Sequence, residues 1–145
     1  MLGDPVKTQH WVREVYNANY SGTSTAYSSY AINDEDQGQM GSLSALISMG
    51  LFQMKGGCEL NPGYQLTAPM FDRIVIHLQP DCYKAKDLVI TASPEPEKNC
   101  YIESVTLNGK PLKSLTITQE QISKGAHLDF KLSSKPNPKW LKLDK

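Results

Sequence analysis

The spacing of apolar residues changes once along this chain of 145 residues, near residue 60. Before that point, apolar positions recur every three or four residues, as on one face of a helix. After it, they fall in short runs with alternation in several of them, as in half-buried strands. Helices followed by strands are typical of α+β folds or of pieces of two domains. We therefore predict an α+β chain with two N-terminal helices and a small antiparallel β module of about six strands.

The first helix is predicted over the segment "GDPVKTQHWVREVYNANY". Asp4 is suited to the N-cap and Pro5 to the first helical position. Trp11 and Val15 then recur at helical spacing. His10 beside Trp11 could form a platform for a sugar ring, but this spacing favours Trp11 as a core residue.

The second helix is predicted to begin between residues 36 and 39 and to run as far as Leu51. Its residues are small or apolar nearly all round, which is typical of a helix buried on most sides. One other long helix cannot cover it. We therefore expect a larger body to cover it, or else self-association or partial disorder of residues 1–54.

The β module is predicted over residues 55–145, which begin with the joining segment "KGGCELNPG". Asn108 and Gly109 both tolerate positive φ, so they predict a hairpin turn. Thr118 and Gly125 are expected to cap and end a short helical turn. His77 alternates with apolar neighbours and is expected to face outward. The six predicted strands are "YQLT", "FDRIVIHL", "DLVITA", "CYIESVTL", "SLTI" and "HLDFKL".

Charge and composition exclude several classes of protein. Lys and Arg total 15, as do Asp and Glu, so the formal net charge is zero. Nucleic acids and anionic membranes favour basic surfaces, so neither is expected as the main partner. No apolar run approaches the length of about 18 residues that a membrane span needs. The N-terminal residues do not form a signal peptide, so any export signal would have to lie in residues that this sequence lacks.

The cysteines do not suggest a zinc site. Cys58, Cys82 and Cys100 are widely spaced and contain no CxxC pair. One disulfide among them is compatible with the sequence, which does not establish its pairing.

Three consecutive carboxylates, Asp34, Glu35 and Asp36, stand just before the second helix. They could simply cap it, because each acidic group near a helix N-terminus contributes about 0.3–1 kcal/mol. Alternatively, Asp34 and Asp36 face one side of an extended segment and together hold and orient a water, as a general base does in glycoside hydrolysis. The long loop before them carries Tyr27 and Tyr30, which are candidates for contact with a sugar.

Several blocks of the sequence resemble the C-terminal end of glycoside hydrolase family 92. The resemblance starts near "KTQHWVREVY" and covers nearly the whole chain. This family contains calcium-dependent, exo-acting α-mannosidases. The blocks that carry the resemblance are "NDEDQGQM", "SMGLFQMKGGCELNPGYQLTAPMFDRIVIHL", "YIESVTLNGKPL" and "PNPKW".

The resemblance implies a fold and a reaction. It implies a β-sandwich domain and an (α/α)6 barrel with the active site between them, so that residues 1–54 would be the last helices of the barrel. Asp36 would be the general base of an inverting reaction, Asp34 its partner, and Glu35 structural. A calcium ion would bind hydroxyls of mannose-containing glycans, including N-glycans that are being degraded. The full-length proteins would be periplasmic or secreted.

The sequence also departs from the family pattern. Along the second helix the family usually reads Gly-Gln-Met-Ser-Ala-Trp-Tyr, whereas residues 38–44 lack the aromatic pair, and Ile32 stands where a glycine is common. The resemblance also implies that the general acid would be a glutamate in barrel segments outside this sequence, so we expect the isolated chain to be inactive. The alternatives are a non-catalytic carbohydrate-binding or structural β module, and a truncated reading frame with no function of its own.

Overall fold

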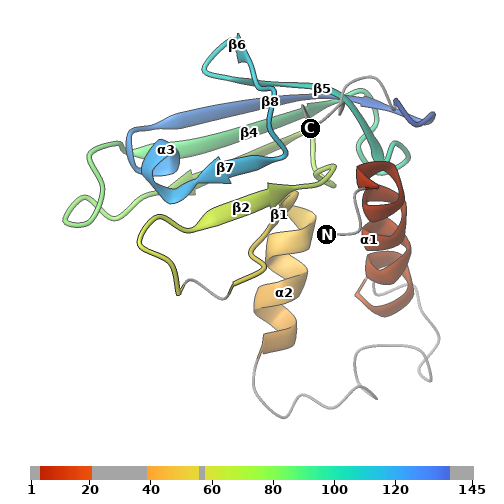
Figure 1. Cartoon of the computed structure of the whole chain (residues 1–145), viewed down its shortest axis with the longest axis horizontal. Coiled ribbons are helices and arrows are strands. Elements are labelled where there is room, and N and C mark those ends of the chain that lie inside the picture. The colour runs from red at the N-terminus through yellow and green to blue at the C-terminus, as the bar shows by residue number, and fades with distance from the viewer. Residues whose placement is uncertain (1–3, 21–38, 56–57, 138–145) are drawn as a thin grey trace.

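The computed structural model describes residues 4–20, 39–55 and 58–137. Within them, two helices precede eight strands that form two sheets (Figure 1). One sheet has the order β1-β2-β7 and the other the order β3-β4-β8-β5-β6. The elements are α1 (Pro5–Asn19), α2 (Gln39–Ser48), β1 (Leu51–Phe52), β2 (Gly63–Leu66), β3 (Arg73–His77), β4 (Asp87–Ser93), β5 (Tyr101–Leu107), β6 (Lys110–Pro111), β7 (Thr116–Thr118), α3 (Gln119–Ser123) and β8 (Ala126–Ser133).

The predicted α+β class is confirmed, and each of the six predicted strands is present. Two short strands, β1 and β6, were not predicted. Every neighbouring pair of strands is antiparallel except β4 and β8, which are parallel. This exception arises because β8 returns after β5, β6, β7 and α3 and lies between β4 and β5.

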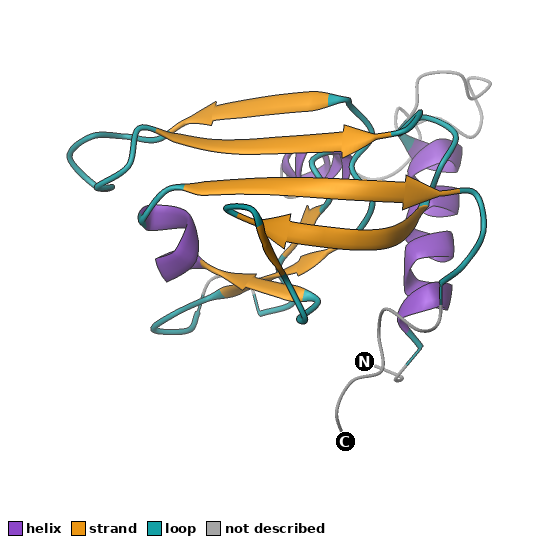
Figure 2. Cartoon of the chain, turned by 90° about the horizontal axis from the view of Figure 1, so that it is seen from above, coloured by secondary structure: helices purple, strands orange, loops and turns teal. Residues whose placement is uncertain are grey.

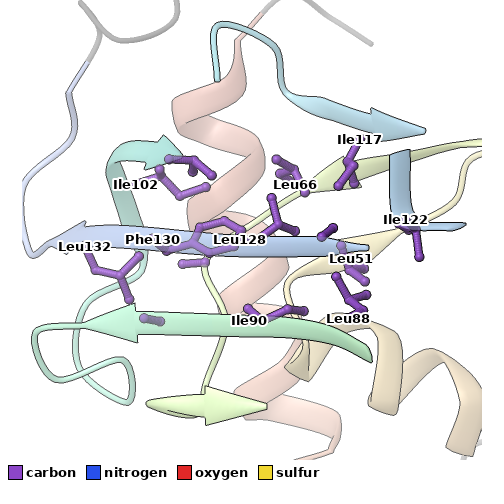
Figure 3. Packing of buried hydrophobic residues seen from close by; sticks show 14 residues of the cluster. Leu51, Leu66, Leu88, Ile90, Ile102, Ile117, Ile122, Leu128, Phe130 and Leu132 are labelled. Atoms are coloured by element: carbon purple, nitrogen blue, oxygen red, sulfur yellow. The ribbon is translucent and has the colours of Figure 1, made fainter. Parts of the chain in front are cut away.

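The hydrophobic core lies between the two sheets. Strand β8 alternates strictly, so that Leu128, Phe130 and Leu132 are buried while the residues between them are exposed. Figure 3 shows these side chains in one cluster with Leu51 and Leu66 of the smaller sheet. Each fully buried side chain of this size contributes about 1.5–3 kcal/mol. The β module therefore buries its own apolar residues.

The predicted turns are confirmed. Asn108 and Gly109 have φ of 52° and 75° and join β5 to β6. Thr118 caps α3 through a capping box with Gln121, and Gly125 follows the helix with φ of 91°. On the outer face, His77 is exposed as predicted, and its Nδ1 lies 2.6 Å from Asp87 Oδ1.

Helix α1 begins as predicted, but its buried face is not the predicted one. The Asp4 side chain caps the helix by accepting a hydrogen bond from Lys7 N, and Pro5 occupies the first turn. The prediction that Trp11 belongs to the core is wrong, because Trp11 is exposed while Gln9 and Arg13 are buried. Figure 2 shows α1 crossing one end of the strands.

Helix α2 is shorter and more exposed than predicted. It ends at Ser48, because Gly50 takes φ of 75° and Leu51 and Phe52 already pair with Leu66 and Gln65. Gly41, Ser42 and Ala45 are exposed, since α2 packs mainly against β1 and α1 among the described elements. The predicted boundary between residues 54 and 55 stays a prediction. Strand β1 already belongs to the sheet before that boundary.

The described part of the chain holds no helix that is long and apolar enough to cross a membrane. Cys58, Cys82 and Cys100 are all described, and no disulfide joins them.

Candidate functional site

The two N-terminal helices flank the segment that carries the predicted catalytic residues. Helix α1 ends at Asn19 and α2 begins at Gln39. Residues 21–38 between them lie outside the described residues, and with them lie Asp34, Glu35, Asp36, Tyr27 and Tyr30. The roles assigned to these residues therefore stay predictions. The structure describes how the helices on either side of the segment are held.

Gln9 attaches α1 to the larger sheet. Its Oε1 accepts a hydrogen bond of 2.7 Å from the backbone N–H of Ile102, near the start of β5. Both residues are buried. A buried backbone N–H that lacked this acceptor would cost about 1–3 kcal/mol, so the contact fixes the position of the helix along the strand.

Arg13, one turn further along α1, attaches the helix to two loops. Its Nη1 donates to the carbonyl oxygens of Pro96 at 2.8 Å and Glu97 at 3.2 Å. Its Nη2 donates to the carbonyl oxygens of Ala68 at 3.3 Å and Pro69 at 3.2 Å. The planar guanidinium thus joins two loops that are far apart in sequence through four backbone acceptors.

The charge of Arg13 is stabilised by these carbonyl dipoles. In the part of the chain that the structure describes, no carboxylate forms an ion pair with it. Burial lowers the pKa of Arg13, and the neighbouring Cys100 and Tyr16 oppose that shift. The burial of Gln9 and Arg13 was not predicted from the sequence. Their spacing of four residues places them on one helix face, but polar residues at that spacing usually indicate a solvated face.

Helix α2 is held at its C-terminal end by backbone hydrogen bonds to the segment after β2. Thr67 N donates to Gly50 O at 2.9 Å, and Met70 N donates to Ser48 O at 3.0 Å. In the same segment, the carbonyl oxygens of Ala68 and Pro69 accept hydrogen bonds from Arg13 of α1. Residues 67–70 therefore contact both helices. The two helices are therefore fixed to the same part of the β module.

A cleft of about 310 Å³ opens between α1, α2 and the smaller sheet. Among the described residues that line it, none is charged and apolar side chains dominate. Trp11, Val15 and Met54 lie at the cleft and are 61%, 47% and 60% exposed. The lining residues are Pro5, Thr8, Gln9, Trp11, Val12, Val15, Leu43, Ile47, Phe52, Met54, Gln65, Leu66, Thr67 and Leu115.

The described residues do not form a site for the expected calcium ion. Calcium takes six to eight oxygen ligands, commonly from carboxylates and carbonyls. Among residues 4–20, 39–55 and 58–137, no group of three or more His, Cys, Asp or Glu side chains could hold a metal ion. A group of such side chains for calcium would have to come from elsewhere.

Comparison with known proteins identifies a family that matches this chain. The model of the glycosyl hydrolase family 92 catalytic domain matches residues 1–134. The search of curated proteins found no match.

Solved structures of the same family share the fold. The family GH92 α-mannosidase BT3965 from Bacteroides thetaiotaomicron is 26% identical, with a TM-score of 0.76 over 94% of this chain. The inverting mannosidase BT2199 from the same species is 28% identical, with a TM-score of 0.73 over 94% of this chain. In both cases this chain covers only 17% of the other chain. By its match to the family over nearly its whole length, the chain belongs to glycoside hydrolase family 92.

Proposed function

We propose that this chain is the C-terminal part of an α-mannosidase that hydrolyses α-linked mannose from glycans with inversion of configuration. The observation that carries the proposal is the family match over residues 1–134, which includes the acidic segment. The names of the related structures support the substrate and the outcome. They are mannosidases, one is described as inverting, and one was solved in complex with mannoimidazole.

In this proposal Asp36 is the general base. Its carboxylate removes a proton from a water molecule as the water oxygen attacks the anomeric carbon from the face opposite the leaving group. Asp34 accepts a second hydrogen bond from that water and orients it. In inverting enzymes, the base and the acid stand about 6.5–9.5 Å apart, which leaves room for this water.

A carboxylic acid outside this chain completes the reaction. It donates a proton to the glycosidic oxygen as the bond to the anomeric carbon breaks, so the electron pair of that bond stays on the leaving oxygen. General acid catalysis contributes about 10²- to 10⁴-fold to the rate. The isolated chain is therefore inactive in this proposal, since it holds the base without the acid.

The two helices support the role proposed for the acidic segment. The segment joins α1 and α2, and both are fixed to the β module by buried hydrogen bonds rather than by side-chain packing alone. Catalysis requires reacting groups to be held in a narrow range of geometry.

The remaining parts of the proposal concern the whole protein. Residues 1–54 form the last helices of the catalytic barrel and residues 55–145 a C-terminal β module. Tyr27 and Tyr30 contact the sugar at the rim of the site. Calcium belongs to the complete enzyme, which acts in the periplasm or outside the cell.

The experiment places this chain in a complete family 92 polypeptide. The region of the BT3965 mannosidase that matches this chain is replaced by it, and release of mannose from an α-1,2-linked mannobiose is measured. We expect Asp36→Asn to lower kcat by at least about 10²-fold with little change in KM, because it removes the base and keeps the shape of the side chain.

Glu35→Gln is the matched control, because it neutralises the adjacent carboxylate that is assigned no chemical role. Equal losses for Glu35→Gln and Asp36→Asn would count against the assignment of the base. Turnover by the isolated chain that Asp36→Asn abolishes would contradict its expected inactivity. Mannose affinity without hydrolysis, unchanged by Asp34→Ala in calorimetry, would favour a carbohydrate-binding module.

A further inference from the structure

A second cavity, of about 540 Å³, is lined by the hairpin that joins β3 to β4. Figures 1 and 2 both show the loop of this hairpin at the end of the strands away from α1. We propose that the cavity binds a sugar that carries an anionic group, either a carboxylate or a phosphate. This site goes beyond the proposed function, because it takes no part in hydrolysis. Its lining residues are His77, Leu78, Pro80, Tyr83, Lys84, Ala85, Lys86 and Asp87.

Two lysines supply positive charge at this cavity. Lys84 and Lys86 both line it, and both are exposed. In the part of the chain that the structure describes, neither lysine forms an ion pair. An ammonium group has three hydrogen-bond donors, and its bonds to anionic oxygens are stronger than bonds between neutral groups. The two side chains are therefore available to hold an anionic group.

The lining also contains a carboxylate, Asp87, which is already held by a neighbour. Its Oδ1 lies 2.6 Å from Nδ1 of His77. This contact uses one carboxylate oxygen, so the other can accept a hydrogen bond from a sugar hydroxyl. Two lysines and one carboxylate leave a net positive charge on the lining. The cavity therefore offers groups both for an anion and for a hydroxyl.

The apolar part of the lining favours a ring-shaped ligand over a bare anion. Tyr83 and Pro80 line the cavity together with the charged residues. The ring of a tyrosine is a flat apolar surface, against which the C–H face of a sugar ring can pack. Small-molecule sites generally combine such a surface with a few placed polar groups. An inorganic anion would use the lysines alone, whereas an anionic sugar uses the whole lining.

Tyr83 is held in place by residues outside the hairpin. Its hydroxyl oxygen accepts a hydrogen bond of 2.9 Å from Nε2 of Gln119 in α3. Oε1 of Gln119 accepts one of 3.0 Å from the hydroxyl of Tyr64 in β2. Burial raises the pKa of Tyr64, which keeps it in the neutral form that donates this bond. Because the Tyr83 hydroxyl is the acceptor in its contact with Gln119, its own proton can be donated to a ligand oxygen.

Backbone hydrogen bonds fix the loop of the hairpin. Leu78 N donates to Lys86 O at 2.7 Å, and the backbone N–H groups of Cys82 and Tyr83 both donate to Gln79 O at 3.0 Å. A loop that is ordered before binding loses little conformational freedom when its ligand arrives. The cavity is therefore a preformed site.

Isothermal titration calorimetry of the 145-residue chain tests this site. The probes are glucuronate and glucose 6-phosphate, which carry a carboxylate and a phosphate on similar sugar rings. We expect saturable binding of at least one of them, and the comparison between them identifies the anionic group. Glucose should bind at least tenfold more weakly, because it offers no charge to the lysines. Acetate and inorganic phosphate should also bind at least tenfold more weakly, because they offer no ring to Tyr83.

Two double variants test whether the cavity is the binding site. Lys84→Gln combined with Lys86→Gln should weaken binding of the anionic sugar at least tenfold. Lys110→Gln combined with Lys113→Gln is the matched control, because it removes the same charge from two exposed lysines that do not line the cavity. The control should bind like the unaltered chain.

Three results would overturn the assignment of this cavity. The first is that neither anionic sugar binds saturably. The second is that glucose, acetate or inorganic phosphate binds as tightly as the anionic sugars. The third is equal binding by the two double variants, since any loss would then reflect net charge and not the cavity.

This readout is independent of catalysis. Binding at the cavity, with no mannose released by the chimera, would keep this site and reject the proposed function. Hydrolysis by the chimera, with no binding of either anionic sugar to this chain, would do the reverse.

Discussion

Phe130 and Trp11 are both large aromatic residues, but Phe130 is 0% exposed and Trp11 is 61% exposed. Phe130 lies between two sheets, and residues from both sheets belong to the cluster that surrounds it. Trp11 lies on a helix whose opposite face contacts the β module, and nothing among the described residues covers it to the same extent.

The two regions differ in how much of their apolar surface their own residues cover. The β module has two apolar sheet faces in one chain, so each face buries the other. The helix pair packs against β1 of the smaller sheet and β5 of the larger one, and Trp11 and Val15 of α1 stay exposed. One region is therefore closed as a core, whereas the other leaves apolar side chains exposed among the described residues.

The largest expected effect contrasts these two aromatic residues. Phe130→Ala should lower the free energy of unfolding by about 3–5 kcal/mol, because it leaves a cavity in a closed core. Trp11→Ala should lower it by less than about 1 kcal/mol, because most of the side chain is already in water. Chemical denaturation of both variants measures the two values. Equal losses would mean that the cleft is closed in solution, and the contrast between the regions would fail.

A smaller effect is expected at the contact that joins the two regions. Arg13→Met should lower the free energy of unfolding by about 2–3 kcal/mol, because it leaves buried carbonyl oxygens without donors. Arg13→Lys should recover only part of the loss, since one ammonium group cannot reach all four acceptors. Glu14→Gln, at an exposed neighbouring position, is the control and should be nearly neutral. A neutral Arg13→Met would show that packing alone attaches α1.

The smallest effect is expected when two glycines are compared, one within α2 and one in the turn that follows it. Gly50→Ala should destabilise the chain by about 1–2 kcal/mol or more, because φ is 75° and the new Cβ would lie 2.5 Å from Thr67 O. Gly41→Ala should instead stabilise it by up to about 1 kcal/mol, because Gly41 lies within a helix and its Cβ would meet nothing within 4 Å. Thermal unfolding of the pair gives the signs, and a stabilising Gly50→Ala would contradict the described turn.

Local signals predicted much of the fold. The N-cap at Asp4, the hairpin turn at Asn108 and the capping box at Thr118 depend on residues within a few positions of each other, and all three are confirmed. The end of α2 was predicted too late, because the sheet pairing of Leu51 with Leu66 is a contact between distant residues. The burial of Gln9 and Arg13 was missed for the same reason, since their partners are 93 and 83 residues away.

The candidate site, like the fold, could be predicted from the sequence only in part. The acidic segment and the family were recognised from the sequence, because the family blocks are contiguous strings of residues. The cleft could not be recognised, because its lining comes from α1, α2, β1, β2 and the separate residues Met54, Thr67 and Leu115, which only folding brings together.

The sequence by itself determined the order of helices and strands, their caps and turns, and membership of glycoside hydrolase family 92. These features depend on short-range sterics, hydrogen bonds and residue order. Only the tertiary structure decided which face of α1 is buried, where α2 ends and where apolar surface stays open. Those outcomes depend on contacts between residues that are far apart in the sequence, and no local pattern of residues specifies such contacts.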